Sequence, residues 1–278
     1  MTTALAPHTA EPRARFLDLA AAEWLKLWSL RSTGWSLLVA ALAVLAFNAG
    51  KAWDNVRYWP DEAGYAEKFI AEGIPLMHAF TTDAGTVMML ATGAFGALAV
   101  TGEYSSGLIR TTFAAVPARR SVMTAKVCVV AAVVTVFGVI VAVASFASTQ
   151  AILSTKGAGV SLDHPGAVRV IVASALLAPV AALVGAALGT LIRHGAGAVV
   201  ANVVLLLLLP VVLDDGRHWS AVLAHTMPYE AWLRLVDIPY GGPGIVHPWS
   251  AGGAWTVYVV WALAAAAVAV TAVHRRDQ

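Results

Sequence analysis

The sequence has few charged residues and a single cysteine. Only 12% of its 278 residues are Asp, Glu, Lys or Arg, whereas about a quarter are charged in an average soluble domain. Apolar residues make up 59% of the chain, and the mean hydropathy is +0.74. This composition excludes a disordered protein and a nucleic-acid binder that uses a basic patch, and it indicates a membrane protein. Cys128 alone provides neither a disulfide framework nor a multi-thiolate metal site.

Sequence motifs for catalysis and nucleotide binding are also missing. The chain has no GxxxxGK[ST] phosphate-binding loop, no HExxH and no GxSxG. Its eight histidines are scattered without the spacing of metal ligands. We therefore expect no catalytic residue, no metal site and no cofactor in this chain, and we do not expect it to be an enzyme.

Long apolar runs predict an all-α, polytopic membrane protein. A membrane-crossing helix needs about 20 apolar residues, and six runs meet or approach this length. They cover about 33–51, 84–101, 123–151, 168–192, 197–213 and 254–273, within a transmembrane domain of residues 33–274. Residues 1–15 form a polar tail without the features of a cleaved signal peptide, and residues 275–278 form a second tail.

The distribution of basic residues predicts the orientation of the spans. Basic residues close to span ends concentrate on the cytoplasmic side of a membrane. If both chain ends are cytoplasmic, 11 of the 18 Lys and Arg residues lie on that side. We therefore expect an N-in, C-in topology in the cytoplasmic membrane.

Residues 16–32 have the pattern of an amphipathic helix that lies along the membrane surface. Its apolar residues fall on one stripe, and its polar residues lie off that stripe. The stripe consists of Phe16, Ala20, Trp24, Leu27 and Trp28, and the polar set of Asp18, Glu23, Lys26 and Ser29. The alternative is a polar tail with periodicity by chance.

A short cytoplasmic helix is expected between the second and third spans. An apolar stripe of Ile109, Thr112, Phe113 and Val116 lies between two helix breakers, Gly107 and Pro117. We expect this stripe to face lipid or to enter a groove of a partner protein.

Charged residues flank this short helix on both sides. Glu103 can pair with Arg110 or with a basic residue of the surface helix, and Arg119, Arg120 and Lys126 are expected to neutralise lipid phosphates.

A longer segment, 214–253, lies between the fifth and sixth spans. It contains four prolines and five Trp or Tyr residues. This composition fits a partly re-entrant or surface-lying element, and a plain extracellular loop is the alternative.

The middles of the spans contain no Asp, Glu, Lys or Arg. Ion-driven carriers generally hold ionisable residues near the membrane midplane, so their absence argues against such a carrier. A secondary carrier or channel that uses Asn48 and Asn202 remains an alternative, as does a non-transporting membrane sensor or immunity subunit.

The stretch from Gly102 to Lys126 resembles a loop of a known transporter family. It contains Gly-Glu-Tyr-Ser-Ser-Gly-Leu-Ile-Arg-Thr-Thr at 102–112, Val-Pro-Ala-Arg-Arg at 116–120, and a lysine at 126. This order is similar to the cytoplasmic loop of ABC-2-type transporter permeases, although Leu108 replaces the usual threonine. Glu-Trp-Leu-Lys-Leu at 23–27 and the number of spans extend the resemblance over the whole chain.

The resemblance implies a permease subunit of an ATP-driven exporter with a lipophilic or amphiphilic substrate. Two such subunits, identical or paralogous, would pair with two copies of a separate ATP-binding protein, which would hold ATP and Mg²⁺. Membrane lipid would be the other partner, and nucleic acid would not be one.

The resemblance also assigns roles to individual residues. Residues expected to couple to the ATPase are Glu103, Tyr104, Gly107, Ile109, Arg110, Thr112, Phe113, Pro117 and Arg119. The surface helix would contribute Glu23, Trp24, Lys26 and Trp28. The candidate residues of the transport pathway, from the second and fifth spans, are Thr86, Met89, Thr92, Gly93 and Asn202.

Overall fold

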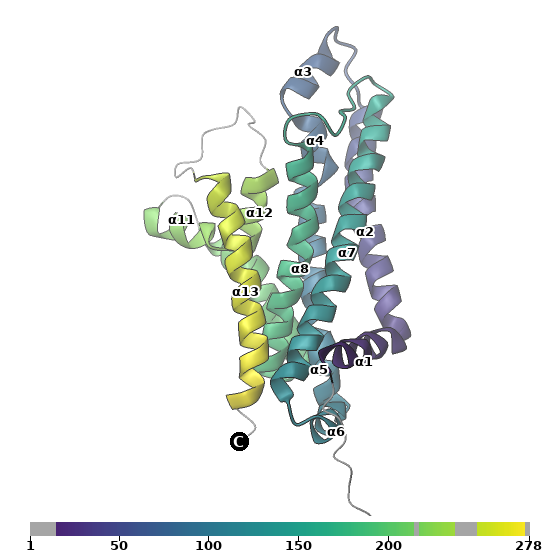
Figure 1. Cartoon of the computed structure of the whole chain (residues 1–278). Coiled ribbons are helices and arrows are strands. Elements are labelled where there is room, and N and C mark those ends of the chain that lie inside the picture. Colours follow the sequence, from purple (N-terminus) through teal and green to yellow (C-terminus); the bar gives the residue numbers. More distant parts are fainter. Residues whose placement is uncertain (1–14, 214–216, 237–248, 276–278) are drawn as a thin grey trace, which may run out of the picture.

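A computed structural model describes residues 15–213, 217–236 and 249–275 (Figure 1). Of the residues in these ranges, 84% are helical, and none is in a strand. Among the described residues, six segments are long and apolar enough to cross a membrane, which confirms the prediction of a multi-pass helical protein. They are α2 (Arg31–Arg57), α4 with α5 (Ile74–Ser105), α7 (Arg119–Ser154), α8 (Ala167–Ile192), the fifth span (Gly195–Val212) and α13 within Ala251–Val273.

The outward surface of these spans is apolar. Large aliphatic side chains such as Val39 on α2, Ile140 on α7 and Leu263 on α13 are each more than half exposed. A soluble monomer rarely exposes apolar surface on this scale, so these faces suit lipid or another membrane-embedded chain.

Helix α8 lies at the centre of the bundle, and its small residues allow close packing. It contacts α5, α7 and α13 along its length. A Cβ placed on Gly185 would lie 1.8 Å from the Gly93 carbonyl oxygen of α5, and one on Gly96 would lie 1.9 Å from that of Ala182. The backbones of α5 and α8 therefore touch directly, which only glycine permits at these two positions.

The fifth span is the irregular one. It consists of α9 (Gly195–Val203), a π-helical turn (η1, Val204–Leu208) and α10 (Leu209–Val212). Pro210 lacks an N–H group, and its ring would collide with the carbonyl four residues earlier in a regular α-helix. The helix widens by one π-helical turn instead, and the Leu209 N–H donates a hydrogen bond to the Val204 carbonyl, five residues earlier.

Short helices occupy both ends of the bundle (Figure 1). Helix α1 (Phe16–Ser29) lies across one end, beside α6 (Leu108–Ala115), and the C-terminal end of α13 (Ala251–Arg275) lies at this same end. Helices α3 (Tyr65–Ala71) and α4 (Ile74–Ala79) lie toward the other. The even number of spans thus places the beginning of α1 and the end of α13 on one side.

Two short helices, α11 (His218–His225) and α12 (Pro228–Val236), lie between the fifth span and α13. Helix α12 packs into the bundle through Trp232, which is fully buried and donates from Nε1 to the Ser174 hydroxyl at 3.1 Å. This part of segment 214–253 is therefore helical and docked, and residues 214–216 and 237–248 lie outside the described ranges.

Several spans are longer than the apolar pattern alone predicts, among them α2, which ends at Arg57 where the pattern predicts an end near residue 51. Helix α5 begins at Thr82 and ends at Ser105, and α7 runs for 36 residues from Arg119 to Ser154. At 1.5 Å per residue, α7 is about 54 Å long, well above the roughly 30 Å of bilayer hydrocarbon. Polar residues at the span ends continue the helix instead of ending it. The predicted tails at 1–15 and 275–278 lie almost wholly outside the described residues.

Replacing Gly96 with Ala tests the contact between α5 and α8. The new methyl group would overlap the Ala182 carbonyl, and overpacking of this kind costs about 1–3 kcal/mol. Gly102→Ala in the same helix is the matched control, because nothing lies within 4 Å of its Cβ position. We expect thermal unfolding in detergent to shift downward for Gly96→Ala only. Equal melting temperatures would contradict the described contact.

Candidate functional site

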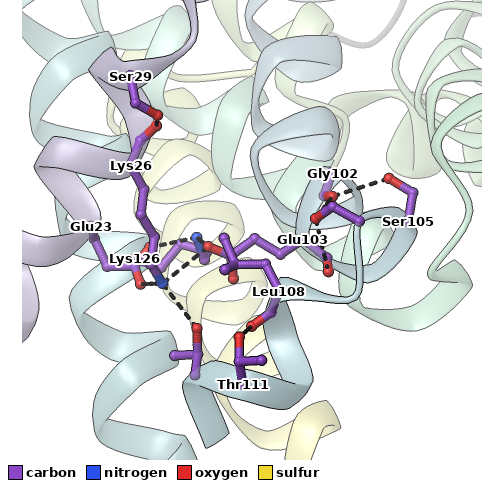
Figure 2. Close-up of polar contacts among 11 residues, drawn as sticks. Glu23, Lys26, Ser29, Gly102, Glu103, Ser105, Leu108, Thr111 and Lys126 are labelled. Carbon is purple, nitrogen blue, oxygen red and sulfur yellow. Dashed lines mark hydrogen bonds and ion pairs between the residues drawn. The ribbon is translucent and has the colours of Figure 1, made fainter. Parts of the chain in front are cut away.

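Four charged side chains converge at the end of the bundle where α1 and α6 lie (Figure 2). Lys126 Nζ of α7 lies 2.5 Å from Glu23 Oε2 of α1 and 2.9 Å from Glu103 Oε1 of α5. Lys26 Nζ lies 2.7 Å from Glu23 Oε1 and 3.2 Å from Glu103 Oε1. We call Glu23, Lys26, Glu103 and Lys126 the charged cluster. It links three helices that are far apart in sequence.

A fourth helix joins the cluster through a hydroxyl group. Lys26 Nζ donates to Thr112 Oγ1 of α6 at 3.3 Å. Helix α6 can turn toward the cluster because Gly107, just before it, has a φ of 74°, a left-handed conformation that favours glycine. Helices α1, α5, α6 and α7 therefore meet at one polar centre.

The cluster is largely buried and electrically neutral, with only Lys26 partly exposed. Glu23, Glu103 and Lys126 are 4–7% exposed, and two carboxylates balance two ammonium groups. Burial alone would lower the pKa of Lys26, but hydrogen bonding and charge from Glu23 and Glu103 raise it above its usual value. Lys26 is therefore charged at neutral pH, and its pairing stabilises the fold until the pH rises through that raised pKa.

The positions of the four residues along their helices explain the convergence. Glu23 and Lys26 are three residues apart on α1 and share a face. Glu103 lies two residues before the end of α5, and Lys126 lies about two turns after the start of α7. The C-terminal end of α5 and the N-terminal end of α7 thus present a carboxylate and an ammonium group to the face of α1 that packs on the bundle.

These contacts correct two of the sequence predictions for this region, those for Lys126 and Glu23, and they confirm one of the two alternatives for Glu103. Lys126 does not neutralise lipid phosphates, because it is buried against Glu23 and Glu103. Glu103 pairs with Lys26 of the surface helix, whereas Arg110 is exposed. Glu23, predicted on the polar side of α1, faces the protein and is buried.

The apolar stripe of α6 also faces inward. Ile109 is buried, and Phe113 and Val116 pack against Leu19 of α1 and Val122 of α7. The chain itself therefore covers Ile109 fully, and it covers Thr112, Phe113 and Val116 in part. The outward face of α6 consists of Leu108, Arg110, Thr111, Ala114 and Ala115, with Pro117 just beyond its end.

The aromatic and basic residues near α6 stabilise its surroundings. The Arg119 guanidinium lies 5.4 Å from the centre of the Phe113 ring, and that of Arg193 lies 5.1 Å from the centre of the Tyr104 ring. Both distances fit cation–π contacts. Arg193 follows α8, so Tyr104 connects the end of α5 to the end of the central helix.

Helix α1 directs its tryptophans away from the bundle. Trp24 and Trp28 are 49% and 44% exposed and contact each other with ring centres 5.7 Å apart. The opposite side carries Leu19 and Glu23, which are buried. Tryptophan is enriched at membrane–water interfaces, so this arrangement suits a helix whose aromatic face meets lipid.

The residues predicted to line a transport pathway are mostly buried within the chain. Met89, Thr92, Gly93 and Asn202 are buried, and Thr86 bonds the Tyr229 hydroxyl at 3.1 Å. Asn202 of α9 packs against Gly93 of α5, where a Cβ would lie 2.4 Å from its amide nitrogen. Among the described residues, the Asn202 amide has no hydrogen-bond partner.

Asn48 has a structural role. Its amide nitrogen donates to Ser145 at 2.5 Å, and its oxygen accepts from the backbone N–H of Thr81 at 2.8 Å and from its hydroxyl at 2.9 Å. Both ends of the amide are therefore engaged in holding α2 and α7 to the start of α5, which weakens the carrier alternative based on this residue.

Two of the cavities within the described residues lie between the helices discussed above. One of about 530 Å³ lies between α1, α2, α5 and α7 and is lined at one end by the charged cluster. We call it the cluster cavity. The other, of about 950 Å³, is lined by residues from α2, the α4–α5 junction, α11 and α12. Within the described ranges, no three His, Cys, Asp or Glu side chains form a group suited to a metal ion.

Sequence reasoning missed the cluster although signals for it were present. Glu23 and Lys26 have the spacing of an ion pair on one helix face. Lys126 is a charge inside a long apolar helix, and such charges are generally paired or functional. The pattern of a single helix could not show that Glu23 and Lys126 meet, because they are 103 positions apart.

Replacing Lys126 with Met tests the contribution of the cluster to stability. The change leaves Glu23 and Glu103 buried with Lys26 as their remaining cation in the cluster, and removing one partner of a buried pair costs about 3–5 kcal/mol. Arg120→Met, at an exposed site on the same helix, is the control and should stay within about 0.5 kcal/mol. Thermal and denaturant unfolding in detergent measure both. Similar losses for the two variants would contradict a structural role of the cluster.

No protein-family model matches this sequence, and no curated protein shows significant similarity to it. The function of the site must therefore be inferred from the geometry and from the motif resemblance.

Proposed function

We propose that this chain is the membrane-spanning permease subunit of an ATP-driven exporter of the ABC-2 type. The observation that carries the proposal is the charged cluster, which joins α6 and α1 to the ends of two membrane-spanning helices. The resemblance of residues 102–126 to the permease loop supports it, as do the six apolar helices. In this reading the chain is a multi-pass protein of the cytoplasmic membrane.

The coupling step follows from the contacts of α6. Its outward residues Arg110, Thr111 and Ala114 would meet the ATP-binding subunit, while its inward residues Ile109 and Phe113 pack on the chain itself. A push on α6 would pass through Thr112 and the cluster to α1, α5 and α7 together. Because the cluster charges are buried and paired, separating them is costly, so these helices would move as one body.

The chemistry of ATP hydrolysis would take place in the partner. The sequence has no phosphate-binding loop, so ATP and Mg²⁺ would be held by the separate subunit, and this chain would catalyse no bond change. Two copies of this chain, or this chain and a paralogue, would form the membrane unit.

The transport pathway would lie beside α5 and the fifth span. Gly93 and Asn202 meet at this contact. Thr86, Met89 and Thr92 lie on the same helix α5, and most of these residues are covered in the single chain. Exposing them would require α9 to move from α5, and the π-helical turn that follows α9 is a site where such a change can be accommodated. The apolar surroundings suit a lipophilic or amphiphilic substrate.

The proposed topology predicts which residues are reachable from outside the cell. In a Cys128→Ser background, which removes the exposed native thiol, we would introduce Thr111→Cys in α6 and Thr155→Cys after α7. A membrane-impermeant maleimide should label Thr155→Cys in intact cells and Thr111→Cys only after permeabilisation. The reverse pattern would contradict the N-in, C-in arrangement.

The coupling role predicts a charge-sensitive surface on α6. Thr111 and Thr155 are both exposed, and each hydroxyl donates only to the carbonyl three residues earlier. Thr111→Glu and Thr155→Glu are therefore matched changes at opposite ends of the molecule.

The measurement begins with purification of the tagged chain in detergent from its native host and identification of a stoichiometric ATP-binding subunit by mass spectrometry. We expect Thr111→Glu to reduce the ATPase activity of the complex reconstituted in liposomes by about tenfold, as a misplaced interface charge costs more than 1.4 kcal/mol. Thr155→Glu should leave it unchanged. Absence of such a subunit, or equal activity of both variants, would contradict the proposal.

A further inference from the structure

The cluster cavity combines an apolar body with a charged end. Its volume of about 530 Å³ falls within the range of small-molecule sites. The body is lined by small and aliphatic residues such as Ala40, Ala91, Ala94 and Val130, and the end by Glu23, Lys26, Glu103 and Lys126. This division matches a molecule with a hydrocarbon tail and a polar head.

One carboxylate oxygen at the charged end lacks a hydrogen-bond donor. Glu103 Oε1 contacts both Lys26 and Lys126, whereas its Oε2 is buried without a partner among the described residues. Glu103 is only 7% exposed and lines the cavity. A buried oxygen of an ionised carboxylate is costly to leave unpaired, so a hydrogen-bond donor brought to this end of the cavity would stabilise Glu103 if its side chain turned toward that donor.

The rim of the cavity reaches the membrane-facing surface. Leu30, Leu98 and Leu108 line it and are 62%, 53% and 42% exposed. Exposed hydroxyl groups of Ser29, Ser32 and Ser106 lie on the same rim. A lipid of the surrounding leaflet could therefore enter sideways with its head near the serines and its tail between α2 and α5.

We propose that the cluster cavity is a binding site for a phospholipid with a primary ammonium head group, such as phosphatidylethanolamine. The ammonium group would donate to Glu103 Oε2, a charge-assisted hydrogen bond. The adjacent phosphate would lie near Lys26, whose side chain is 26% exposed, and near the rim hydroxyls. A zwitterionic head adds no net charge to the neutral cluster. This site goes beyond the proposed transport function and does not require an ATP-binding partner.

Competition between two lipids tests the site. Phosphatidylethanolamine and phosphatidylcholine with identical acyl chains differ only in the three methyl groups that remove every N–H donor. The full chain, purified in detergent with an equimolar mixture, is analysed by native mass spectrometry for retained lipid. We expect about a tenfold preference for phosphatidylethanolamine, since a hydrogen bond to a charged group is worth at least this factor.

Three variants separate this site from general lipid contact. Ala94→Phe fills the cavity and should abolish the preference, whereas Ala132→Phe, on an exposed face of α7 outside the cavity, should retain it. Glu103→Gln removes the anionic acceptor and should equalise the two lipids while some lipid is still retained. Equal retention of both lipids by the unaltered chain, or a preference that survives in Ala94→Phe, would overturn the proposal.

Discussion

The pairing of four charges, three of them buried, constrains one whole end of this molecule. An unpaired charge away from water costs several kcal/mol, so Glu23, Lys26, Glu103 and Lys126 fix where α1 can lie relative to α5 and α7. Helix α1 lies across the bundle end because that position brings Glu23 and Lys26 to their partners. Its exposed tryptophans, Trp24 and Trp28, then face outward, where lipid can cover them.

A second constraint, the close backbone packing of α5 on α8, stabilises the centre of the bundle. Gly93 and Gly96 on α5 meet Ala182 and Gly185 on α8 with backbone in direct contact. Interiors packed this closely transmit displacement rather than absorb it. The charged cluster attaches α6 and α1 to α5 at one end, and the glycine contact attaches α5 to α8 along its length. Displacement at α6 would therefore reach the centre of the bundle with little loss.

The sequence predicted the spans well because hydrophobic length is a property of each segment alone. The short helix between Gly107 and Pro117 was also evident, since its breakers are local. What could not be predicted was which face of each helix the chain itself would cover. On α1 and α6 the face toward the bundle includes Glu23 and Thr112, and periodicity ranks residues by polarity without showing their partners. Burial of Lys126 was missed for the same reason, because its partners lie on other helices.

The close packing of α5 and α8 restricts where the molecule can change shape. If α1, α5, α6, α7 and α8 are joined by charge pairs and backbone contact, relative motion must occur at a less regular element. The fifth span is that element, because its ladder of hydrogen bonds is widened before Pro210. The fifth span contacts α5 where Asn202 packs on Gly93. The Asn202 amide has no hydrogen-bond partner among the described residues. A buried amide without partners is costly, so any second position of α9 that gave it one would be favoured by that contact. Asn202, which lacks hydrogen-bond partners in the present arrangement, would then stabilise the second arrangement. The two arrangements would differ in whether α9 covers the face of α5 around Gly93.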